Sequence, residues 1–254
     1  AALCRALTEA RAVYCAFVFD REILDALPAP DDRRVEFIRD SVCELDAALR
    51  ARGGGLIVRH ARARNAIPEL AAALGVQVVH ANHDYEPVAC DRDAAIAQAL
   101  AARGISFRTA KDQVIFERDE VLSQAGRPFS VFTPYKNAWL GRLTPSDLQA
   151  YPIDRYADAL ALPPPDLTGP IPALEAMGFR RTNLKALRIG TGMSAGAALF
   201  ADFRERIDRY REARDFPAAK GPSYLSVHLR FGTVSIRELV AFAHLRSLEP
   251  DGAG

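Results

Sequence analysis

Two serines near the C-terminal end of the chain, Ser223 and Ser226, stand in a pattern that suits anion binding. They follow a Gly-Pro break at residues 221–222. Serine is a preferred N-cap residue, so Ser223 is predicted to begin a helix over residues 224–231. The backbone N–H groups of residues 224–226 would then have no partner within the helix, and such groups bind phosphate and other anions readily.

The residues on either side of this turn add charge and a second helix start. Ser235 is followed three residues later by Glu238, the spacing of a capping box, which predicts a helix beginning there. Tyr210 lies thirteen residues before Ser223 in a charged, helix-like segment. Taken alone, Tyr210 is an ordinary residue of an amphipathic helix, and Arg214 is one member of a solvated charge pair with the aspartate after it.

The charge of the chain is unevenly distributed. The net charge is +1, but the segment from Arg180 to Arg246 holds 13 Lys and Arg residues against 6 Asp and Glu residues. An excess of seven positive charges can face the phosphates of a nucleic acid. From charge alone, a solvated helix face explains it equally well.

Other kinds of chemistry find no support. The glycine run at residues 53–55 is not followed by the Lys-Ser/Thr of a P-loop, and no Gly-x-Ser-x-Gly elbow occurs. His80 and His83 share a loop without cysteine partners, so we expect structural histidines and no metal site.

Composition points to an ordinary globular protein. The chain has 254 residues, 49% of them hydrophobic and 26% charged, which is enough to bury a sizeable core. No apolar run reaches membrane-spanning length, and no signal peptide is visible. The four cysteines are scattered without a Cys-x-x-Cys pair, as in reduced proteins. We therefore expect a cytoplasmic protein that does not contact the membrane.

The first half of the chain alternates between short apolar runs and amphipathic segments. Such alternation predicts a doubly wound α/β fold, with a parallel sheet covered on both faces by helices. The expected strands lie at 13–19, 56–58, 76–79 and 105–109, and the expected helices at 35–49, 67–74 and 90–103.

The second half of the chain is rich in proline at first and then shows only helical patterns. Residues 141–172 hold seven of the 16 prolines and are predicted to belong to an interdomain linker. From residue 173 on, the pattern is helical and has no strand signal. The expected helices there lie at 199–210, 224–231 and 236–245.

These residues together resemble the flavin-binding signature of the DNA photolyase/cryptochrome family. That signature is Tyr-x-x-x-Arg-Asp-x-Pro, then Gly-Thr-Ser-x-Leu-Ser, then Gly-x-x-Ser-x-Arg. The chain matches it from Tyr210 to Arg237, except that Pro222 stands in place of the threonine. Residues 17–38, 81–87 and 131–139 resemble other family segments in the same order.

The resemblance is strongest to the N-terminal part of a bacterial cyclobutane pyrimidine dimer photolyase. It implies a Rossmann-like α/β antenna domain at residues 1–128, a linker at 129–172 and the first helices of a helical FAD-binding domain at 173–254. The family's first strand has no counterpart here. We therefore expect the sheet to lack that strand, and the chain to be a piece of a longer protein.

The resemblance also implies a cofactor and site residues. FAD would be held at its phosphates, and Arg214 would lie at the rim that contacts damaged DNA. Proline at 222 offers neither an N–H nor a hydroxyl, so FAD binding is expected to be weaker there. The residues implied for FAD are Tyr210, Pro222, Ser223, Tyr224, Leu225 and Ser226.

The implied activity is light-driven repair of pyrimidine dimers by electron transfer from excited reduced FAD, in a monomeric enzyme. No residue of this chain receives a catalytic role, because the family's electron-transfer residues lie past residue 254, and we expect residues 1–254 alone to be inactive. A second, antenna chromophore, folate or deazaflavin, stays unresolved, and another flavin or no antenna at all is also open. Family members that bind folate carry Asn-Glu where this chain has Val88 and Ala89.

Two alternatives remain at this point. A cryptochrome, which signals in blue light instead of repairing DNA, would share the same signature. A Rossmann-like nucleotide-binding module without photochemistry would explain residues 1–128 but not the segment from Tyr210 to Arg237.

Overall fold

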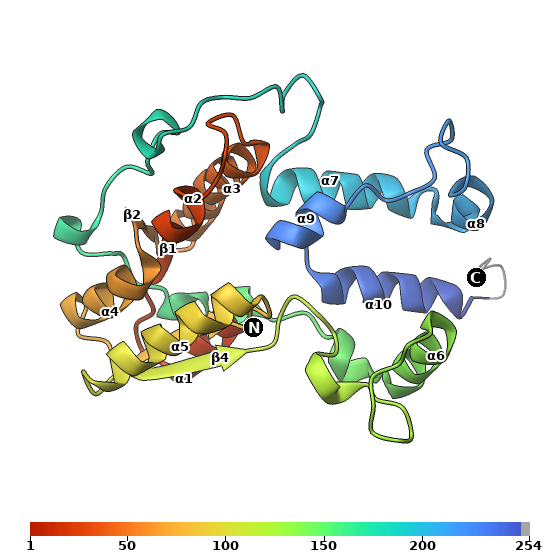
Figure 1. The fold of residues 1–254 in the computed structure, drawn as a ribbon, viewed down its shortest axis with the longest axis horizontal. Coiled ribbons are helices and arrows are strands. Elements are labelled where there is room, and N and C mark those ends of the chain that lie inside the picture. Colours follow the sequence, from red (N-terminus) through yellow and green to blue (C-terminus); the bar gives the residue numbers. More distant parts are fainter. Residues whose placement is uncertain (250–254) are drawn as a thin grey trace. The chain divides into compact units, whose positions relative to one another are not determined.

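The computed structural model describes residues 1–249, which divide into two compact units (Figure 1). One unit contains residues 1–110 and 152–197. The other contains residues 111–151 and the chain from Ala198 on. These units do not coincide with the ranges predicted from sequence, and the domain boundaries at residues 128 and 172 stay predictions. Within residues 1–249, no helix is long and apolar enough to cross a membrane.

The elements follow one another along the chain as strands and helices first and helices alone later. Their bounds are α1 (Ala2–Glu9), β1 (Cys15–Asp20), α2 (Arg21–Leu24), α3 (Arg33–Arg50), β2 (Leu56–Ala61), α4 (Ala63–Ala73), β3 (Val78–Asn82), α5 (Pro87–Ala101), β4 (Ser106–Ala110), α6 (Phe132–Arg142), α7 (Gly192–Arg204), α8 (Tyr210–Ala213), α9 (Ser226–Phe231) and α10 (Ile236–Ser247). Short 3-10 turns lie at Arg118–Glu120, Pro145–Leu148, Ile153–Ala159, Pro165–Leu167, Glu175–Met177 and Ile207–Arg209.

The four strands pair in parallel, as the alternation of strands and helices predicted. β1 pairs with β2, with Cys15 opposite Leu56, and β3 pairs with β4, with Val78 opposite Ser106. Over the described part of the chain, these are two separate two-stranded sheets, since no ladder joins one pair to the other. The α/β class is therefore confirmed, with its strands in two parallel pairs.

Helix α3 shows how the local sequence determines where a helix begins and ends. Asp32 is the N-cap, and its carboxylate accepts a hydrogen bond from the Arg34 N–H at 2.8 Å. After the helix, Gly53 takes a φ of +82°, a conformation that glycine adopts without strain. Val35, Val42 and Leu49 on the inner face of α3 are 1%, 4% and 5% exposed, so this face lies in the centre of the core.

The proline-rich segment folds back onto the α/β unit. The Val13 N–H donates to the Ala159 carbonyl at 2.8 Å, and the Ala161 N–H donates to the Val13 carbonyl at 3.0 Å. Leu160 between them is buried in the same core as Val13. Backbone pairing and apolar burial thus order the middle of the segment that the composition marked as a linker.

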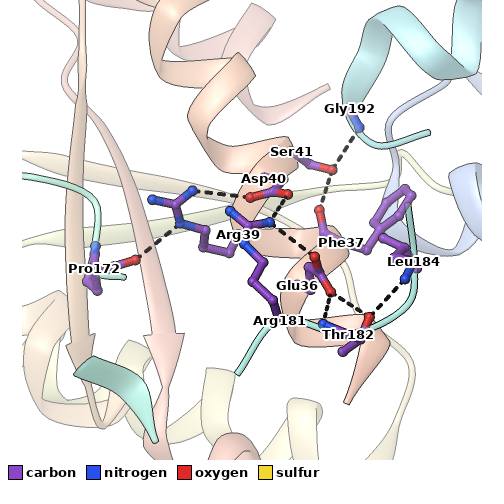
Figure 2. Close-up of polar contacts among 10 residues, drawn as sticks. All are labelled: Glu36, Phe37, Arg39, Asp40, Ser41, Pro172, Arg181, Thr182, Leu184 and Gly192. Atoms are coloured by element: carbon purple, nitrogen blue, oxygen red, sulfur yellow. Dashed lines mark hydrogen bonds and ion pairs between the residues drawn. The ribbon is translucent and has the colours of Figure 1, made fainter. Parts of the chain in front are cut away.

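A second contact holds the continuation of this segment against α3 (Figure 2). Glu36, 5% exposed, accepts from the Thr182 N–H at 2.7 Å and from Arg181 Nη1 at 3.1 Å. Arg181 also donates to Asp40 at 2.6 Å. Ser41, one turn further on, accepts from the Gly192 N–H at 3.0 Å. We call residues 180–194 the strap, because side chains of α3 hold it in place.

The helical unit departs from the expected helix boundaries. The helix predicted at 199–210 ends at Arg204 and is followed by a 3-10 turn and the separate, one-turn α8. The helix predicted at 236–245 is present as α10. α7 and α10 lie side by side (Figure 1), and Phe200 meets Phe242 edge to face with ring centroids 5.5 Å apart.

Candidate functional site

Tyr210 begins α8 and presents its side chain to solvent. The residue is 40% exposed. Its ring packs edge to face against Phe203 at 6.1 Å between centroids, and the guanidinium of Arg214 lies over it at 5.8 Å. Phe203 and Arg214 therefore fix the orientation of the Tyr210 ring, while the residue remains accessible to solvent.

The turn before α9 differs from the prediction that Ser223 begins the helix. α9 begins at Ser226, and the N-cap position is Leu225, whose side chain makes no capping hydrogen bond. The Ser223 hydroxyl instead accepts from the Leu225 N–H at 3.4 Å, within the turn. The reason lies in Tyr224, whose φ of +58° interrupts helical geometry, and in Leu225, which is only 2% exposed. Anchoring of this apolar side chain in the core takes precedence over the serine cap.

The residues implied by the signature nevertheless form one turn with exposed polar groups. Pro222, Tyr224 and Ser226 are exposed and Ser223 is half-buried. The first N–H groups of α9 have no acceptor within the helix, as at any helix start. Hydroxyls and backbone N–H groups are the donors that phosphate oxygens accept from.

The structure brings Tyr210 and this turn together through Gly221. A Cβ added at Gly221 would lie 2.6 Å from the Ala213 carbonyl oxygen and 2.8 Å from the Arg214 nitrogen. Only glycine lets the two backbones approach this closely. The end of α8 is therefore packed directly against the start of the turn.

Arg214 lies in the same neighbourhood. Its side chain is 51% exposed, and its Nε is 3.6 Å from the Asp215 carboxylate, itself 76% exposed. An exposed ion pair of this length contributes little to stability. The guanidinium, stacked over Tyr210, is available to an anion from solvent.

The inner side of the turn borders an apolar cleft of about 500 Å³. Ser223 and Leu225 form part of its wall, with Trp139, Phe200 and Phe242 among the rings opposite. The Trp139 ring meets Phe116 edge to face at 5.5 Å. The turn thus separates an apolar interior from a polar outer face.

The second predicted helix start is confirmed, and Arg237 has a structural role. Ser235 is the N-cap of α10, and its hydroxyl accepts from the Glu238 N–H at 3.4 Å. Arg237 is 6% exposed, donates to the Asp112 carbonyl at 2.8 Å and stacks over Tyr151 at 4.7 Å. These contacts fix α10 in the helical unit.

Sequence reasoning missed a cluster beside the turn. Arg206 donates to the carbonyls of Lys220 and Gly221 at 2.6 and 2.8 Å, and also to Asp202. The only signal available was the i, i+4 spacing of Asp202 and Arg206, which is common on helix surfaces. Nothing in that spacing indicates a contact with residues 14 and 15 positions further on.

The carboxyl ends of the parallel strands carry a second set of polar residues, in the α/β unit. Asp20, at the end of β1 and 6% exposed, accepts from the N–H groups of Glu22 and Ala63 at 3.0 and 3.3 Å. After β3, His83 Nε2 lies 2.9 Å from the Thr109 hydroxyl. Small ligands of α/β folds bind at this edge of the sheet. The loop with Tyr85 and Glu86, expected to follow a strand, does follow β3.

The sequence profile of DNA photolyase matches residues 1–153 of the chain, which therefore belongs to the DNA photolyase family. The deoxyribodipyrimidine photo-lyase of Halobacterium salinarum is 34% identical over 242 residues, which cover 94% of this chain and 48% of that protein. The deoxyribodipyrimidine photo-lyase of a Synechococcus strain is 32% identical over 232 residues, 87% of this chain and 46% of the relative. The cryptochrome DASH of Natronomonas pharaonis is 30% identical over 190 residues, 73% of this chain and 39% of that protein.

Solved structures show the same fold. A class III photolyase from Agrobacterium tumefaciens superimposes on 99% of the chain with a TM-score of 0.82 at 22% identity, and 52% of that structure is covered. An archaeal photolyase from Sulfolobus tokodaii, solved with two FAD molecules, gives a TM-score of 0.76 at 23% identity, over 98% of this chain and 52% of that structure. The chain thus spans about half the length of the relatives it matches.

Proposed function

We propose that the full-length protein is a deoxyribodipyrimidine photolyase, which binds FAD and uses light to split cyclobutane pyrimidine dimers in DNA. The observation that carries this proposal is the extent of the match. A relative of that name aligns over 94% of the chain, and so over both the α/β part and the helical part. A nucleotide-binding module without photochemistry would account for the first of these parts only.

The residues at the turn before α9 fit the diphosphate of FAD. Tyr210, Ser223 and Ser226 bear hydroxyls, and the first N–H groups of α9, which begins at Ser226, have no acceptor within the helix. Pro222 supplies no donor, so binding depends on the remaining groups. In this proposal, these residues hold and orient the cofactor and carry out no bond-breaking step.

When bound, the reduced flavin supplies the electron that opens the dimer after it absorbs light. On the substrate side, the chain would contribute Arg214, whose side chain is 51% exposed. Photolyases extrude the damaged nucleotides from the duplex, which costs less for a poorly paired lesion. Arg214 would contact the DNA backbone and hold the duplex in place while this happens.

A second chromophore would bind at the carboxyl ends of the strands, where Asp20 and His83 lie. The absence of the Asn-Glu pair at Val88 and Ala89 disfavours folate, and a deazaflavin or a second flavin stays open. The Sulfolobus photolyase, which has a similar fold and was solved with two FAD molecules, is a precedent for a second flavin.

A cryptochrome is the second candidate, because the cryptochrome DASH relative is 30% identical over 190 residues. An absorption spectrum of the purified full-length protein tests the shared part of both proposals, since both require flavin bands. An irradiated oligonucleotide that contains one thymine dimer then separates them. Loss of the dimer under blue light supports a photolyase. A flavoprotein that leaves the dimer intact in light and in darkness supports a cryptochrome.

A further inference from the structure

The turn that would hold the FAD diphosphate is anchored from within mainly by the buried side chain of Leu225, which fixes one end of it. Tyr224 takes a φ of +58°, which is rare for a residue with a side chain. α9 is six residues long and lacks a side-chain cap. Short helices and left-handed residues persist only where surrounding structure imposes them. Another group must therefore hold the turn in place.

Arg206 makes the contacts that such a group requires. Its Nη1 donates to the Lys220 and Gly221 carbonyls at 2.6 and 2.8 Å. Its Nε and Nη2 both donate to one oxygen of Asp202, at 3.1 and 3.0 Å. The other Asp202 oxygen accepts from Lys220 Nζ at 2.6 Å. Both the main chain and the side chain of the segment before the turn are thus bound to the end of α7.

Aromatic rings enclose the same guanidinium. It lies 5.2 Å from the centroid of Phe203 and 5.8 Å from that of Tyr224, and the Arg206 side chain is 16% exposed. Four of its five N–H donors are used by Asp202 and the two carbonyls. The Arg206 guanidinium is therefore positioned to hold the turn, and only one of its N–H donors remains for a phosphate.

Gly221 completes the arrangement on the other side. Its backbone is packed against Ala213 and Arg214, at the end of the helix that Tyr210 begins. Pulling residues 220–221 toward α7 therefore fixes both the turn and its distance from α8. Displacement of Arg206 would release both halves of the candidate phosphate site at once.

We propose that Arg206 is a positioning residue for the FAD diphosphate, which keeps the turn at residues 221–226 formed before the cofactor binds. The inference rests on the proposed function for the identity of the ligand. A preformed turn raises affinity because the cost of ordering it is not taken from the binding free energy. Lysine cannot replace arginine here, since it has no planar fork to join two carbonyls and a carboxylate.

The test compares Arg206→Lys with Arg204→Lys in the full-length protein. Arg204 is the last residue of α7, two positions before Arg206, is exposed and stacks over Phe242 at 4.7 Å, so its substitution makes the same chemical change without touching residues 220–221. FAD affinity of the apoprotein is measured by titration with fluorescence detection. We expect Arg206→Lys to weaken FAD binding about tenfold or more, as for the loss of hydrogen bonds from a charged group. Arg204→Lys should bind as the wild type does.

Hydrogen exchange in the apoprotein supplies the second readout. Amides of residues 220–226 should exchange faster in Arg206→Lys, and those of α3 should not change. Asp202→Asn leaves the guanidinium in place but weakens the hydrogen bonds that hold it, so it should give a smaller effect in the same direction. This variant replaces Arg206→Lys in both measurements if Arg206→Lys does not fold.

Three results would overturn the inference. FAD affinity in Arg206→Lys could equal that of the wild type. Affinity could fall without faster exchange at 220–226, which would mean that Arg206 touches the phosphate directly. Arg204→Lys could reproduce both effects. Failure of the wild type to bind FAD would instead contradict the proposed function, and the exchange comparison in the apoprotein would still test the role of Arg206.

Discussion

At the scale of single residues, the candidate site depends on a division of tasks between neighbours. Leu225 anchors the turn in the core, while Ser223, Tyr224 and Ser226 remain at its surface. The residue types of the site could be predicted from sequence, because a resemblance carries them position by position. The helix start could not, because a serine cap contributes only about 1 kcal/mol, less than burial of a leucine side chain, at about 1.5–3 kcal/mol.

Ser226→Ala should change the FAD affinity of the full-length protein, and Ser235→Ala should change its stability. Ser226 is exposed and caps nothing, so its loss should lower FAD affinity and leave stability within about 0.5 kcal/mol of the wild type. Ser235 caps α10, so its loss should cost about 1 kcal/mol of stability without changing FAD affinity. Titration with FAD and thermal unfolding of the apoprotein measure both. Equal FAD affinity in wild type and Ser226→Ala would remove this hydroxyl from the site.

Arg214→Ala tests the predicted contact with DNA. Because phosphate contacts do not read sequence or damage, binding to damaged and undamaged duplexes should weaken by similar factors. The slope of log K against log salt should shrink by about one unit, since one fewer counterion is released. Arg211→Ala, an exposed arginine on the same short helix, is the matched control. If Arg214→Ala leaves the DNA affinity and its salt dependence unchanged, Arg214 only contacts Tyr210 and Asp215 and does not bind DNA.

At the scale of elements, α3 organises the α/β unit through two different faces. Its apolar face, with Val35, Val42 and Leu49, was predictable from the spacing of apolar residues. Its polar contacts with the strap were not, because Glu36 and Arg181 are separated by 145 positions. A glutamate in the first turn of a helix is expected on the surface, and only the folded chain shows it buried beneath Thr182 (Figure 2).

The contact between Glu36 and the strap should make stability depend on acid pH. Burial alone would raise the pKa of Glu36, but hydrogen bonds from Thr182 and Arg181 outweigh burial and hold the pKa below its ordinary 4.5. A lowered pKa in the folded state means that the stabilisation is complete above the unfolded value and is lost as the pH falls through the folded value. The strap should therefore loosen in acid.

Glu36→Gln should remove that dependence. We expect it to destabilise the protein by about 1.5–3 kcal/mol at neutral pH, the range for hydrogen bonds to a charged group, and to flatten the decline in melting temperature below pH 4.5. Glu175→Gln, an exposed glutamate of the same unit, is the control and should behave as the wild type. A Glu36→Gln protein that melts with the control at every pH would show that the carboxylate does not hold the strap.

At the scale of the whole molecule, the class of fold was predictable and the grouping of its parts was not. Apolar runs and glycine stops located the four strands to within a few residues, because burial and chain reversal are local signals. The return of residues 152–197 to the α/β unit depends on contacts such as Val13 with Leu160, which pair residues remote in sequence. Proline content marked residues 141–172 only as an interdomain linker.

The most direct test of the central claim is the fate of a thymine dimer in a defined oligonucleotide, incubated with the purified full-length protein under blue light. We expect the dimer to disappear in the light, at a rate that depends on bound reduced FAD, and to persist in darkness. Removal of FAD should stop the reaction, and its return should restore it. A protein that binds FAD and the damaged duplex yet leaves the dimer intact after prolonged illumination would contradict the account.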